Sequence, residues 1–115
     1  MSLKKLLEEV LSEMLSEEKT DTPVEFKKHP YVIGEKYLIR TVTMIYTGKL
    51  IEVHADELVI KDAAWIADTG RWHDACTKGT LNEVEPYAKG DSVIVSRGAI
   101  LDVSPWSFDL PSEQK

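Results

Sequence analysis

Hydrophobic positions in the first 18 residues recur every three or four residues, which is the spacing of one face of a helix. The apolar residues are Leu3, Leu6, Leu7, Val10, Leu11, Met14 and Leu15. Ser2 precedes them and can cap the first turn. The pattern predicts an amphipathic helix over residues 1–18. Because a helix this short is marginal alone, we expect its apolar face to pack on its own domain or, through Leu3, Leu7, Val10 and Met14, on a neighbouring subunit.

A strand pattern follows a connector over residues 19–30, which contains two prolines and is expected to run extended over the surface. From residue 31 onward, β-branched and aromatic residues alternate with polar ones. The pattern predicts five strands, over residues 38–46, 49–53, 58–66, 92–95 and 99–103. Thr47-Gly48 marks a turn or bend, residues 54–57 form a hairpin connection, and Arg97-Gly98 separates the last two strands. Residues 109–115 are expected to form the tail, frayed from Pro111 to Lys115.

The order of these elements predicts a mainly β protein of one domain. Its 115 residues leave room for one domain and not two. One helix followed by five short strands favours a small, strongly bent antiparallel barrel over residues 31–108, with a long loop inserted at 67–91. A loop of that length is usually functional or has structure of its own. We expect a short helix around Trp72 that stops at Gly79.

Two segments resemble the signature sequences of the Sm-like family, which includes the LSm and Hfq proteins. The first segment, residues 46–63, has Gly48 in a bent second strand, an acidic turn at Asp56-Glu57, and Asp62-Ala63 at the end of the third strand. The second segment, residues 93–103, has two apolar strands around Arg97-Gly98. The resemblance implies a barrel whose last two strands end at the subunit edge, where pairing with neighbours closes a ring. We therefore expect a homo-oligomer, a hexamer by that analogy.

The same resemblance bears on RNA binding. The family's RNA pocket uses an Asp, an Asn four residues later, and the Arg-Gly step. Here Asp56 is followed four residues later by Ile60, so the resemblance leaves Asp56, Arg97 and Gly98 as the candidate RNA contacts. If Arg97-Gly98 turns the chain tightly, Gly98 is expected to have a positive φ or to lie under a close backbone approach.

Charge weighs against nucleic acid as the main partner. The chain carries 14 Lys and Arg against 20 Asp and Glu, a net charge of -6. No segment concentrates positive charge, whereas phosphate binding requires cations. We therefore expect a non-enzymatic, ring-forming structural or interaction protein that acts as a scaffold, with an Hfq-like RNA-binding regulator as the alternative. Other protein partners are compatible with either role.

The inserted loop contains the residues of a weaker alternative, a small enzyme. His73 and Cys76 supply two possible metal ligands where zinc needs four, or three and a water. As a base and a nucleophile they have no orienting acid at a recognisable spacing. Asp68-Thr69-Gly70 matches the aspartic protease signature but is also a common turn. The sequence therefore assigns no catalytic residue, no metal and no cofactor.

The single cysteine, the length of the apolar runs and the tryptophans bear on the compartment of the protein and on its packing. The single cysteine excludes an intramolecular disulfide, and no apolar run approaches the ~20 residues that cross a bilayer. A cytoplasmic protein without membrane contact is expected. Three tryptophans are many for this length. We expect them to be buried or interface anchors, with Trp72, Trp106 and Phe108 at a subunit contact.

Overall fold

The computed structural model describes residues 2–10 and 29–115, and the chain divides into two units, residues 1–31 and 32–115. In the first unit, residues 3–10 are helical, and the Lys5 N–H donates to the Ser2 hydroxyl over 3.2 Å, as the predicted cap requires. Leu3, Leu7 and Val10 have exposed side chains. The rest of the predicted helix, with Met14, and the connector to residue 28 lie outside the described residues.

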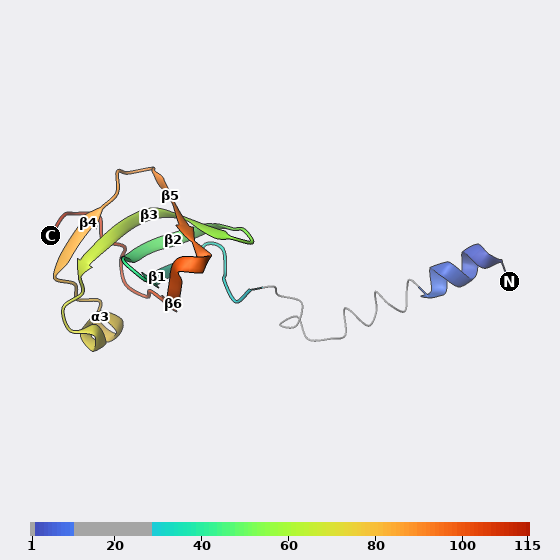
Figure 1. The fold of residues 1–115 in the computed structure, drawn as a ribbon, viewed down its shortest axis with the longest axis horizontal. Coiled ribbons are helices and arrows are strands. Elements are labelled where there is room, and N and C mark those ends of the chain that lie inside the picture. Colours follow the sequence, from blue (N-terminus) through green and yellow to red (C-terminus); the bar gives the residue numbers. More distant parts are fainter. Residues whose placement is uncertain (1, 11–28) are drawn as a thin grey trace. The chain divides into compact units, whose positions relative to one another are not determined.

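The second unit is built on one antiparallel sheet of six strands (Figure 1). The strands are β1 (Lys36–Thr41), β2 (Ile45–Val53), β3 (Glu57–Asp68), β4 (Glu83–Pro86), β5 (Ser92–Ser96) and β6 (Ile100–Pro105). The helix α3 (Trp72–Lys78) joins β3 to β4, and the 3-10 helix η1 (Arg97–Ala99) joins β5 to β6. The mainly β class predicted from the sequence is confirmed.

The topology differs from the expected closed five-stranded barrel. The strands follow the order β4-β3-β2-β1-β6, and β5 pairs with the first half of β3. The sixth strand is β4, which lies within the segment expected to be a loop and pairs with the second half of β3. The sheet is not closed into a barrel, since β5 pairs only with β3 and β6 only with β1.

The first hairpin turn also lies elsewhere than predicted. The expected strand 38–46 is divided between β1 and β2, and Thr47-Gly48 lies inside β2. The chain reverses between Thr41 and Met44, where the Thr41 hydroxyl accepts the Met44 N–H over 2.9 Å. The turn was missed because its residues are β-branched or apolar, and because a threonine side chain closes it instead of the usual Gly, Asn or Asp.

Gly48 allows close packing in the central strand β2, and the bend that the sequence pattern implied there stays a prediction. Its neighbours on β2 pair with Ala64 and Lys61, so a bulge on β3 faces Gly48. A Cβ at Gly48 would lie 2.8 Å from Cδ1 of Ile60, which is fully buried. The glycine therefore allows β2 and β3 to approach at the bulge, where Asp62 has a φ of 51°.

The inserted segment 67–91 closes one side of the core. Gly79 ends α3 in the left-handed conformation, as expected for its stop. One core cluster combines buried residues of the sheet, this segment and the C-terminal region: Leu38, Ala64, Ile66, Ala75, Leu81, Val84 and Trp106, with Phe108 packed against it. Trp106 thus belongs to the chain's own core and Phe108 packs against it, while their expected role at a subunit contact stays a prediction.

The C-terminal residues are also ordered by the sheet, in contrast to the predicted frayed tail. Lys115 and Val84 exchange backbone hydrogen bonds of 3.0 and 3.1 Å. The Gln114 side chain donates to the Glu85 carboxylate over 3.0 Å. The tail therefore covers the outer edge of β4, because pairing at Val84 occupies the side of that strand that faces away from β3.

Candidate functional site

The outer edge of β5 is the most open part of the sheet. On one side β5 pairs along its whole length with β3, from Glu57 opposite Ser96 to Lys61 opposite Ser92. No strand of the described residues pairs with its other side. The sequence Ser-Val-Ile-Val-Ser contains no charge, proline or bulge, the features that normally block further pairing at an exposed edge. β5 is therefore able to accept another strand.

Ile94 makes this edge apolar as well as open. Val95 is buried at 4% exposure, whereas Ile94 at the centre of the strand is 65% exposed. Three consecutive β-branched residues are typical of a strand covered on both faces, but here only the face of Val95 is covered. Sequence reasoning did not single out Ile94, because it resembles a core residue until the structure shows which face the sheet covers.

The outer edge of β6 is less regular. Arg40 pairs with Asp102 and Thr41 with Ile100, so Leu101 between them is the extra residue of a bulge. Leu101 is 62% exposed, and Pro105, which has no N–H, ends the strand. Both features hinder continuous pairing along β6.

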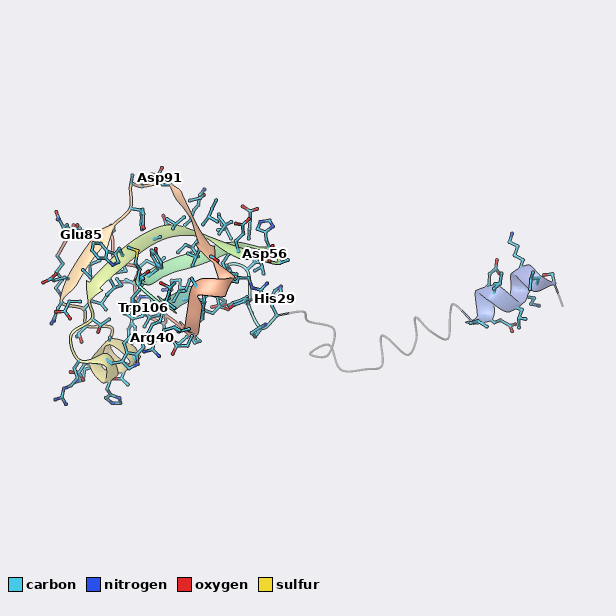
Figure 2. The ribbon with its side chains drawn as sticks, in the orientation of Figure 1. His29, Arg40, Asp56, Glu85, Asp91 and Trp106 are labelled. Atoms are coloured by element: carbon cyan, nitrogen blue, oxygen red, sulfur yellow. The ribbon has the colours of Figure 1, made fainter. Side chains whose placement is uncertain are left out.

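The residues proposed for RNA contact do come together at the end of β5. The Arg97 N–H donates to the Asp56 carbonyl over 2.9 Å, which joins η1 to the β2–β3 hairpin. The Arg97 guanidinium donates to the carbonyls of His54 and Ala55 over 2.8 and 3.3 Å. Figure 2 shows Asp56 at the tip of this hairpin. Arg97 thus holds the hairpin tip in place, and its guanidinium donates its hydrogen bonds to backbone carbonyls of this chain.

Gly98 does not have the conformation predicted from the sequence. It is absent from the glycines with a positive φ, and a Cβ there would meet only the Ser96 hydroxyl oxygen, at 3.7 Å. The chain turns between β5 and β6 through the 3-10 helix η1. Such a helix uses right-handed backbone angles that any residue adopts, so glycine is not required at this position.

Trp72 lies on the surface beside β1 and β6. The Arg40 guanidinium carbon is 4.8 Å from the centre of the Trp72 ring, and Figure 2 places Arg40 beside α3. The Arg40 guanidinium also forms a two-point hydrogen-bonded pair with the Asp102 carboxylate. Those hydrogen bonds hold the pKa of Asp102 below its usual range. This cluster attaches α3 to the sheet. Within it, the Arg40 guanidinium is already engaged by the Trp72 ring and by the Asp102 carboxylate.

The inserted segment does not assemble a catalytic constellation. His73 and Cys76 are both exposed on α3. The Asp68 carboxylate accepts the Gly70 N–H over 2.8 Å, which makes Asp68-Thr69-Gly70 a side-chain-closed turn. Within residues 2–10 and 29–115, no three His, Cys, Asp or Glu side chains gather closely enough to hold a metal ion.

A shallow cavity of about 420 Å³ lies between the β3 bulge, the β4–β5 connection and the C-terminal region. Alanine, proline, leucine, serine and tyrosine side chains line most of it, and its charged residues are Asp62 and Lys89. The ring of Tyr87, on the cavity wall, lies at a tilt of 34° to the ring of Tyr46, with 6.4 Å between ring centres. The pKa of Tyr46 is raised, mainly by its burial and to a smaller extent by the neighbouring Tyr87. His73 and Cys76 are not among the lining residues.

No protein-family model, curated protein or solved structure matches the chain. Across the part of the chain that the structure describes, none of the helices has the length and apolar character needed to span a bilayer.

Proposed function

We propose that the protein is a non-enzymatic assembly component that associates with copies of itself through the outer edge of β5. The observation that carries the proposal is the unprotected edge itself, with its exposed central Ile94. An edge strand without charge or proline is a template for another strand, since pairing satisfies its backbone groups. Burying Ile94 in the same contact adds hydrophobic stabilisation.

The Sm-like ring is one form that such an assembly could take. In that family-like arrangement β5 of each copy would pair with β6 of the next, and six copies would close the ring. The bulge at Leu101 and the proline at position 105 make β6 the weaker of the two edges. The ring therefore stays a hypothesis, and the proposal of self-association rests on β5.

Self-association is tested by the mass of the purified full chain in solution. Native mass spectrometry and light scattering at increasing micromolar concentrations are expected to show a species heavier than the 13.0 kDa chain. A small strand-edge contact gives modest affinity, so the heavier species is expected to grow with concentration. A single monomeric species at every concentration would contradict the proposal.

RNA binding is the second candidate function, because Asp56, Arg97 and Gly98 are brought together at one end of β5. Two properties count against it. The Arg97 guanidinium already donates to two hairpin carbonyls, and each added copy of the chain multiplies a net charge of -6.

Arg97→Ala separates the structural role from the RNA role. The variant is expected to lose about 1–2 kcal/mol of unfolding free energy, because two hydrogen bonds to the hairpin disappear. Binding of labelled A-rich and U-rich oligonucleotides at physiological salt is expected to be weak for wild type and unchanged in the variant. Sub-micromolar binding by wild type that Arg97→Ala abolishes would favour the RNA-binding function instead.

A further inference from the structure

The segment around β5 is symmetric about Ile94. Residues 90–98 read Gly-Asp-Ser-Val-Ile-Val-Ser-Arg-Gly. The same residue types therefore stand at equal distances on either side of Ile94, except that Asp91 corresponds to Arg97. When such a strand pairs with a second copy in antiparallel register centred on Ile94, like residues face each other and the two opposite charges meet. A two-fold contact requires this kind of self-complementarity.

The backbone of β5 is in the correct phase for this pairing. In an antiparallel ladder, successive residues direct their N–H and C=O groups to opposite edges of the strand. The Arg97 N–H donates toward the β3 side, to the Asp56 carbonyl, and the register continues without a shift from Ser96 to Ser92. The alternation therefore directs the backbone groups of Ser92, Ile94 and Ser96 to the open edge.

We propose that β5 pairs in antiparallel orientation with β5 of a second copy, with Ile94 directly opposite the partner subunit's Ile94. This inference rests on the proposed self-association and names its partner and register. The two sheets then continue into each other. The two Ile94 side chains, each 65% exposed in the single chain, cover each other on the same face. β-branched residues in directly opposed positions are favourable cross-strand pairs.

Charge supports the same register. Asp91 is the residue immediately before β5, in the connection that follows β4, and Figure 2 shows it at the opposite end of β5 from Asp56. In the centred register Asp91, just before β5, lies next to the partner subunit's Arg97, just after β5. The Arg97 guanidinium keeps its hydrogen bonds to the His54 and Ala55 carbonyls, and its positive charge still attracts the partner's carboxylate, so one opposite-charge pair flanks each end of the contact. A shift of the register by two residues would separate these pairs and also move Ile94 from its counterpart. The charges thus select one alignment among those that an uncharged strand allows.

The β5–β5 contact also differs from ring closure in the edge that it requires. It uses only the regular edge of β5, whereas a ring requires β6 and its bulge at Leu101. Two copies complete the contact and leave no open β5 edge. The expected assembly through this contact is therefore a dimer.

Ile94→Lys tests the edge in the full-length chain. The side chain is exposed in the monomer, so the fold is expected to persist, as checked by circular dichroism and melting temperature. The dissociation constant of the dimer is expected to rise by about tenfold or more, because two apolar side chains are replaced by facing charges. Leu101→Lys is the matched control, since Leu101 is 62% exposed but lies on β6, and it is expected to leave the dimer intact.

A cysteine at position 94 tests the register. In a Cys76→Ser background, Ile94→Cys treated with a short bis-maleimide is expected to give a covalent dimer in high yield, since only a two-fold contact places position 94 against itself. Val42→Cys, at a position that is 66% exposed outside β5, is the control and is expected to remain uncrosslinked.

The outcomes separate the two proposals. A dimer that is lost in Ile94→Lys and crosslinks at position 94 supports both. A monomer at all concentrations overturns both. A larger assembly, or a dimer that does not crosslink at position 94 and is unaffected by Ile94→Lys, overturns the β5–β5 contact. If Leu101→Lys dissociates such a larger assembly, the proposal of self-association stands and the ring arrangement gains support.

Discussion

Replacing Trp106 with alanine is expected to remove a large part of the stability of the folded unit. Trp106 is 3% exposed and belongs to the core cluster that joins the sheet to the inserted segment. Its ring packs edge-on against Phe108 at 5.0 Å between centres, and its indole N–H donates to the Asp109 carbonyl over 3.1 Å. Truncation leaves a cavity and costs about 3–5 kcal/mol, against a total of about 5–15 kcal/mol for a typical domain.

The matched control for Trp106 is Trp72→Ala. Trp72 is 36% exposed and contacts Arg40 through its ring face, so its loss is expected to cost only about 0.5–1 kcal/mol for that contact. Urea unfolding followed by circular dichroism measures both variants. Equal destabilisation by the two substitutions would contradict the assignment of Trp106 to the core.

Replacing Gly79 with alanine is also expected to destabilise the folded unit strongly. Gly79 has a φ of 71°, and a Cβ there would lie 2.5 Å from Cγ of Phe108. The left-handed backbone costs a non-glycine residue about 1 kcal/mol, and overpacking against the ring costs about 1–3 kcal/mol more. The melting temperature is therefore expected to fall by roughly 10 °C or more for a domain of this size.

Two further variants isolate the cause of the Gly79 effect. Gly98→Ala is the control, because Gly98 has neither a positive φ nor a close neighbour, and it is expected to melt within about 2 °C of wild type. Adding Phe108→Leu to Gly79→Ala is expected to relieve part of the clash, so the two substitutions are non-additive. If Gly79→Ala melts like wild type, Phe108 does not pack against α3 as described.

Comparison of particular elements shows which sequence signals were reliable. The stop of α3 at Gly79 was predictable, because a glycine after a short helical pattern is a local backbone signal. The turn between Thr41 and Met44 was not, because a threonine hydroxyl replaces the usual turn residues. Gly98 was misassigned because a glycine between two strands has the same sequence pattern whether the chain turns through positive φ or through a 3-10 helix.

The candidate site was predictable only in part. Arg97 and Asp56 were grouped only through the resemblance to the Sm-like signatures, and the β3–β5 pairing of the structure places Arg97 beside Asp56. The use of its guanidinium on hairpin carbonyls depends on where the hairpin tip lies in space. Likewise, the symmetry of residues 90–98 is visible in the sequence. It indicates a two-fold contact only because the structure makes β5 an edge strand with Ile94 on its uncovered face.

The sequence by itself determined the mainly β class, the positions of β3, β5 and β6, and the stop of α3, because each depends on local periodicity or on one residue's backbone preference. Only the tertiary structure decided that the sheet stays open, that β4 adds a sixth strand, that Trp106 lies in the core, and that the outer edge of β5 has no partner strand in the described chain. Those properties depend on which distant segments cover a given face or edge. A pattern of neighbouring residues records that a side chain is apolar but not what will cover it.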